Sequence, residues 1–120
     1  MVTITYLPEF LRQAKRLTKK YPSFPEDLKT FAKELSVNPL AGSDLGSGIR
    51  KVRMAIKSKG KGKRGGARVI IFNIAVNGDK TDVTLLTVYD KSERESMYDK
   101  SERESISDSE IVALKNKVGL

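Results

Sequence analysis

Two apolar stretches separated by a tight turn limit most strongly what this chain can fold into. Residues 68–76 and 82–89 are apolar or β-branched at nearly every position, which is typical of buried strands. Between them, Asn77-Gly78-Asp79-Lys80 is a strong hairpin signal, because Asn and Gly tolerate the positive φ of tight hairpin turns. We therefore expect an antiparallel pair within a sheet, and helices covering one face of that sheet.

The segments before this hairpin predict one strand and two helices. Residues 2–6 alternate and are β-branched, which indicates a strand. Apolar residues then recur at the spacing of one helical face until Tyr21, which precedes a proline and ends the helix. Ser23 and Glu26, three positions apart, predict a capping box at the start of a second helix, which Asn38-Pro39 closes. Residues 40–48 are rich in Gly and Ser and predict a loop.

The segment 50–68 contains nine Lys and Arg side chains and no carboxylate. Its first half alternates as a strand does, with an apolar face (Val52, Met54, Ile56) and a cationic face (Lys51, Arg53, Lys57). Its second half is a glycine- and lysine-rich loop without an apolar anchor, so we expect a mobile tip in solvent. Such a run is often only a solvated face. Because like charges this dense repel one another, a polyanion such as RNA is the alternative that we favour.

A direct repeat follows the last strand. The octapeptide YDKSERES occupies residues 89–96 and again 98–105, within a nine-residue tandem repeat that spans 89–106. A nine-residue shift turns a helix by about half a revolution and reverses the face of a strand, so the two copies cannot fill equivalent positions. We expect the first copy to be structural and the second to lengthen the connection to a final helix, capped by Ser107 and Glu110. The order β-α-α-β-β-β-α predicts one small α+β domain over residues 1–120, with a mainly antiparallel sheet.

The composition excludes several kinds of chemistry. The chain lacks Cys and His, which removes disulfides, thiolate nucleophiles and the commonest general base and metal ligand. Eight of the fifteen carboxylates lie in residues 90–110, in and just after the repeat, where Lys and Arg are interspersed, so we expect no metal site and no cofactor. We expect no membrane span and no signal peptide, and a cytoplasmic protein. Residues 90–110 hold eight acidic and four basic side chains, so the rest of the chain carries a net charge of +12. Such a basic body favours nucleic acid or an acidic protein as partner.

One reaction fits these residues, the metal-free attack of an RNA 2′-hydroxyl on the neighbouring phosphate. The reaction requires in-line positioning of the reacting groups, a base, an acid for the 5′-oxygen, and cations around the phosphate. Lysine can act as the base where neighbouring cations lower its pKa, whereas arginine stays charged. The residues expected near one phosphate are Lys51, Arg53, Arg68, Tyr89 and Lys91, although Tyr89 fits a packing role equally well. The residues expected to bind RNA from the loop are Lys57, Lys59, Lys61, Lys63 and Arg64.

The segments GIRKVRMA, KGKRGGARVI and LLTVYDKSERE, in this order, resemble the RelE/ParE superfamily of toxins from type II toxin–antitoxin systems. The resemblance is closest to RelE-like toxins of the HigB type and covers nearly the whole chain. It implies a RelE-like fold and an mRNA interferase that cuts without metal in the ribosomal decoding site. It places the working residues on Lys51, Arg53, Arg68 and Lys91, with Tyr98 nearest to a C-terminal tyrosine of the family. The nine-residue duplication departs from the family pattern.

The same resemblance implies a cognate antitoxin, with an acidic segment and often with DNA-binding activity. Two alternatives stay open at this point. The ParE-like branch of the superfamily poisons DNA gyrase, and in that case the cations would serve binding alone. A non-catalytic RNA-binding or ribosome-associated module would need the same basic surface.

Overall fold

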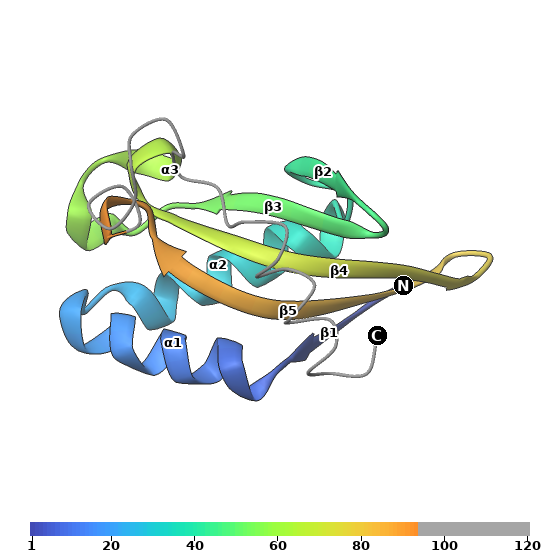
Figure 1. Ribbon diagram of the computed structural model, residues 1–120, viewed down its shortest axis with the longest axis horizontal. Coiled ribbons are helices and arrows are strands. Elements are labelled where there is room, and N and C mark those ends of the chain that lie inside the picture. The colour runs from blue at the N-terminus through green and yellow to red at the C-terminus, as the bar shows by residue number, and fades with distance from the viewer. Residues whose placement is uncertain (94–120) are drawn as a thin grey trace.

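A five-stranded sheet organises the chain in the computed structural model, which describes residues 1–93 (Figure 1). The strands lie in the order β1-β5-β4-β3-β2; β1 runs parallel to β5, and every other neighbouring pair is antiparallel. Helices pack against this sheet, which confirms the predicted small α+β fold. In chain order the elements are β1 (Val2–Tyr6), α1 (Pro8–Lys20), α2 (Phe24–Val37), β2 (Ser43–Gly46), β3 (Ile49–Met54), η1 (Lys57–Lys59), α3 (Gly62–Gly65), β4 (Ala67–Asn77) and β5 (Lys80–Asp90).

The face of the sheet that α1 and α2 cover holds the main core. Phe10 and Leu17 of α1 and Phe31 of α2 are buried there against strand residues such as Val69 and Leu85. The spacing of the apolar residues predicted this arrangement, because one stripe of each helix must face the sheet. The helix ends are also confirmed: α1 ends one residue before Tyr21, and α2 ends at Val37 before Asn38-Pro39.

The predicted capping box is wrong. Ser23 occupies the N-cap position of α2, but its backbone is already helical (φ −78°, ψ −8°) and its side chain caps no backbone N–H. The Ser23 hydroxyl instead donates to Asp27 Oδ2 at 2.6 Å. A cap hydroxyl reaches the first free N–H groups from an extended backbone, and that geometry is absent at this residue.

The loop predicted at residues 40–48 contains an additional edge strand, β2. Ser43 pairs with Lys51 and Asp44 pairs with Arg50, so β2 extends the sheet beyond β3. All four residues of β2 are exposed, so no alternation of apolar and polar side chains marks the strand. Backbone hydrogen bonds hold it, together with the Arg50 guanidinium, which donates to the carbonyl oxygens of Ala41 (3.0 Å) and Gly42 (2.9 Å).

The hairpin predicted around Gly78 is confirmed, and its second strand contains a bulge. Ile70 of β4 pairs with Thr87, whereas the next residue of β4 pairs with Leu85, so Leu86 is an extra residue in β5. Before the bulge, Leu85 belongs to the helix-covered core; after it, Tyr89 packs with Ile70 in a second, smaller cluster on the opposite face. A bulge changes the face to which the following side chains point. It thereby places Thr87 and Tyr89 on the face that carries the cations of β3.

The predicted final helix and the second copy of the repeat lie outside the described residues. The first copy begins inside them, with Tyr89 and Asp90 as the last two residues of β5. No helix in residues 1–93 is both long and apolar enough to cross a membrane.

Candidate functional site

A hollow of about 640 Å³ lies beside β2 and β3. We call it the basic hollow, because its lining includes four cationic side chains and no carboxylate. One wall is the chain before β2, where Gly42 has φ +83° and an added Cβ would lie 2.2 Å from the carbonyl oxygen of Lys51. The residues that line it are Ala41, Gly42, Ser43, Lys51, Val52, Arg53, Lys63 and Arg68.

The strand register brings the predicted cations together. Lys51 and Arg53 alternate along β3, and they pair across to Ile70 and Arg68 of β4. Directly paired residues point to the same face of a sheet, so Lys51, Arg53 and Arg68 share one face. The sequence hypothesis required these three residues to converge on one concavity, and they do so in the basic hollow. Their part in catalysis stays a prediction.

Arg68 lines the hollow but is buried, so it exposes almost no surface to a ligand. Only 1% of its surface is accessible. Its guanidinium donates to the carbonyl oxygens of Arg64 (2.9 Å), Ala67 (3.2 Å) and Lys63 (3.3 Å). Arginine suits this position because its planar group presents several N–H donors at once. Arg68 therefore supports the turn that contains Lys63 and Arg64, of which Lys63 lines the hollow.

The cation-rich connection between β3 and β4, residues 57–66, is here called the basic loop. The sequence predicted a solvent-exposed loop without an apolar anchor, and the structure adds two short helical turns within it, η1 and α3. Its start is attached to the beginning of α2, where the N–H groups and hydroxyls of Ser23 and Ser58 exchange two hydrogen bonds of 2.9 Å. Beside them the Lys57 N–H donates to Asp27 Oδ2 at 3.0 Å. The anchors are polar, so a search for apolar residues could not find them.

Lys59, predicted to bind RNA, points into the protein. Its Nζ donates to Asp90 Oδ1 at 2.7 Å and to Ser92 Oγ at 3.0 Å, and only 7% of its side chain is accessible. Direct RNA binding by Lys59 is therefore not supported. The other loop cations, Lys57, Lys61, Lys63 and Arg64, are exposed as predicted. Among them Lys63 lies 3.3 Å from a carboxylate oxygen of Glu34.

Asp90, which sequence reasoning did not select, is fully buried at the end of β5. Besides Lys59, the hydroxyl of Tyr21 donates to its Oδ2 at 2.5 Å and the Ser92 N–H donates to its Oδ1 at 2.9 Å. Burial raises the pKa of Asp90, but hydrogen bonds from Lys59, Tyr21 and the Ser92 backbone outweigh burial and lower this pKa below its ordinary value. Burial and the hydrogen bond to Asp90 raise the pKa of Tyr21 to about 12.

Tyr89 and Lys91 do not line the basic hollow. Tyr89 lies opposite Arg68 in the register, but it is only 4% accessible and packs against Ile49 and Ile70. This contact supports the packing role that the sequence left open. Lys91 follows β5, and its backbone N–H donates to the carbonyl oxygen of Gly66 at 3.2 Å, which joins the end of the basic loop to the segment after β5.

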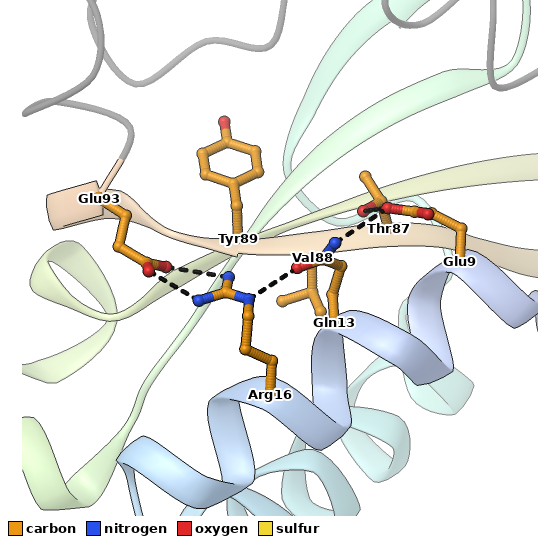
Figure 2. A pocket seen from close by; sticks show the side chains of 7 residues that line it. All are labelled: Glu9, Gln13, Arg16, Thr87, Val88, Tyr89 and Glu93. Carbon is orange, nitrogen blue, oxygen red and sulfur yellow. Dashed lines mark hydrogen bonds and ion pairs between the residues drawn. The ribbon is translucent and has the colours of Figure 1, made fainter.

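Tyr89 lines a second hollow, of about 250 Å³, between α1 and the end of β5 (Figure 2). Here Glu9 Oε2 accepts hydrogen bonds from Gln13 (3.2 Å) and Thr87 (3.5 Å). Arg16 holds Glu93 through two hydrogen bonds of 2.7 and 3.0 Å. In Figure 2 the Tyr89 ring extends from β5 away from α1. The polar groups of this hollow pair with one another, and they fix α1 to the segment after β5.

The first copy of the repeat is structural over residues 89–93, as predicted. Tyr89 packs in the second cluster, Asp90 binds Lys59, and Glu93 binds Arg16. The sequence signal for Asp90 is its place at the end of an apolar strand in a cation-rich protein, because a buried carboxylate there requires a cation as its partner.

No protein-family model matches the sequence. Within residues 1–93, no group of three or more Asp or Glu side chains is placed to hold a metal ion. The likeness to RelE-like toxins therefore rests on the sequence motifs described above.

Proposed function

We propose that this chain is a RelE-like toxin of the HigB type, an endoribonuclease that cuts mRNA in the decoding site of the ribosome and so inhibits translation in the cytoplasm. The observation that supports the proposal is the basic hollow, in which cations from β3, β4 and the basic loop line one concavity without a carboxylate. Such a surface attracts phosphate, and its cations lie on a sheet that holds their positions.

The proposed reaction needs no bound cofactor. The 2′-oxygen of a nucleotide attacks the adjacent phosphorus, and the bond to the 5′-oxygen of the next nucleotide breaks. The products are a 2′,3′-cyclic phosphate and a 5′-hydroxyl, which receives the proton that the 2′-hydroxyl loses. Lys51 and Arg53 lie beside each other on β3 and would bind the two non-bridging oxygens, whose negative charge grows in the transition state. A lysine of the hollow would transfer the proton.

The basic loop would hold the RNA on both sides of this phosphate. Lys57, Lys61 and Arg64 are exposed there and provide contacts that do not depend on sequence. Each phosphate contact releases counterions, so affinity should fall steeply with salt. The same cations would bind the acidic segment of a cognate antitoxin, and an antitoxin in the hollow would exclude RNA.

The test is to induce the protein in cells and to map mRNA 5′ ends on translating ribosomes. We expect new ends within translated codons. The double substitution of Lys51 and Arg53 by Met should reduce cleavage by about a hundredfold or more, because both transition-state cations are lost. Lys80→Met is the matched control, because Lys80 is an exposed cation at the hairpin turn and does not line the hollow. Its loss should leave mRNA cleavage unchanged. Unchanged transcripts after induction would refute the proposal.

A non-catalytic RNA-binding module is a second candidate, and one observation favours it. Two of the five residues expected to take part in catalysis, Arg68 and Tyr89, are only 1% and 4% accessible. If the chain only binds RNA, single substitutions at Lys51 and Arg53 should weaken binding modestly and evenly, and purified ribosomes should yield no new mRNA ends. A large loss of cleavage at unchanged affinity would exclude this candidate.

A further inference from the structure

The buried carboxylate of Asp90 joins three parts of the chain that are distant in sequence. Tyr21 reaches it from the end of α1, Lys59 from the basic loop, and the Ser92 N–H from the segment after β5. A fourth group, the Lys20 ammonium, lies 3.7 Å from Oδ2 and is half exposed. The carboxylate itself is inaccessible to solvent, so the protein supplies all its partners.

Lys59 differs from every other cation of the basic loop. Its neighbours Lys57 and Lys61 are exposed, whereas its own side chain enters the protein and ends on Asp90. A buried ammonium requires a paired anion, because an unpaired charge in the interior is strongly unfavourable. The Lys59–Asp90 pair therefore determines which side of η1 faces inward, and this orientation turns the remaining cations outward.

The Lys59–Asp90 pair lies between two other attachments of the basic loop. Ser23 and Ser58 hold the start of the loop, and Arg68 holds the carbonyl oxygens near its end. The residues between them, around Gly60, are attached to the body of the protein by the Lys59 side chain. Loss of Lys59 should therefore release the middle of the loop without unfolding the protein. Asp90 would keep Tyr21, the Ser92 N–H and the nearby Lys20 as partners.

We propose that Asp90 is a positioning residue, which fixes the basic loop beside the basic hollow through the buried ammonium of Lys59. RNA affinity then depends on a lysine that RNA does not touch. The inference rests on the proposed function for its RNA part, whereas the attachment of the loop can be measured without RNA.

The test compares Lys59→Met with Lys57→Met, a matched loss of one cation from the same turn. Amide hydrogen exchange of the full chain is measured first. In Lys59→Met we expect exchange of residues 58–62 to accelerate by about tenfold or more, because this segment loses its central attachment, and exchange in β4 and β5 to stay the same. In Lys57→Met, exchange should not change, because the Lys57 backbone contact to Asp27 remains.

Binding of a labelled single-stranded RNA is then measured over a range of salt concentrations. Lys57→Met should reduce the slope of log affinity against log salt by about one, as expected for one lost phosphate contact. Lys59→Met should weaken binding by about fivefold or more at fixed salt, together with the faster exchange. Equal behaviour of the two variants, or unchanged exchange in Lys59→Met, would overturn the proposal.

Asp90→Asn provides a second route to the same result. This variant leaves the Lys59 ammonium buried without its anion, so it should be less stable than the double variant Asp90→Asn/Lys59→Met. Both should show fast exchange in residues 58–62, and slow exchange in both would refute the role of Asp90. If neither the parent protein nor any variant binds RNA, the proposed function and the RNA part of this inference fail. The exchange data then still decide whether Asp90 holds the loop.

Discussion

The helix-covered face of the sheet and the end of the sheet that carries the basic loop are held together by different physical interactions. On the helix-covered face, α1 and α2 cover strand residues such as Val69 and Leu85, and contact among apolar side chains supplies the stability. At the end that carries the basic loop, here called the polar end, the loop and the hollow beside it are held by polar contacts, with Arg68 on carbonyl oxygens and Lys59 on Asp90. Apolar packing tolerates many side chains of similar volume, whereas each polar attachment needs a specific partner. Substitutions in the two regions should therefore differ in kind as well as in size.

The largest effect is expected on the apolar face. Phe31→Ala removes a buried ring of α2 and leaves a cavity between α2 and the sheet, so it should reduce the free energy of unfolding by about 4 kcal/mol. Urea denaturation at neutral pH measures this loss. The effect should be nearly independent of pH, because the Phe31 ring does not titrate. A loss below about 1 kcal/mol would contradict the apolar account of this face.

The same difference explains which parts of the structure the sequence could predict. The strand at residues 2–6, both helices and the hairpin at Gly78 were predicted correctly, because apolar periodicity and turn residues are local signals. β2 was missed, because an exposed edge strand needs no apolar residue. The bulge at Leu86 was also missed, because an extra residue within an apolar run leaves no mark on its pattern.

The candidate site was predicted in part. The convergence of Lys51, Arg53 and Arg68 followed from the alternation of β3 and from pairing with the next strand. The inward orientation of Lys59 could not be predicted, because the loop offers several similar cations and its partner Asp90 lies 31 residues away. The choice among them depends on tertiary geometry, which places the end of β5 beside η1.

The second-largest effect is expected at the polar end. Asp90→Asn leaves the Lys59 ammonium without its anion, so we expect a loss of about 3 kcal/mol in the free energy of unfolding at pH 7. The pKa of Asp90 is lowered in the folded protein, so its contribution is fully present above the ordinary carboxyl pKa of about 4 and is lost as the pH falls through the folded-state value. The difference between parent and variant should therefore shrink below pH 4.

Urea denaturation at several pH values between 3 and 7 measures this difference. Phe31→Ala serves as the comparison, because its deficit should stay constant over the same range. If the deficit of Asp90→Asn is equally constant, the carboxylate stabilises the polar end by its volume and not by its charge.

The smallest effect concerns Tyr21, which donates to Asp90 from the end of α1. Tyr21→Phe removes one hydrogen bond to a charged group and should reduce the free energy of unfolding by about 1 to 2 kcal/mol at neutral pH. Burial and the bond to Asp90 raise the pKa of Tyr21 to about 12, so the folded state favours the protonated phenol. The stabilising contribution of Tyr21 is full below the ordinary tyrosine pKa of about 10 and is lost as the pH rises through about 12.

Ultraviolet titration should show a tyrosine component near pH 12 in the parent protein that is missing from Tyr21→Phe. Identical titration curves would mean that Tyr21 does not donate to Asp90, and Lys59 would then hold this carboxylate without help from Tyr21.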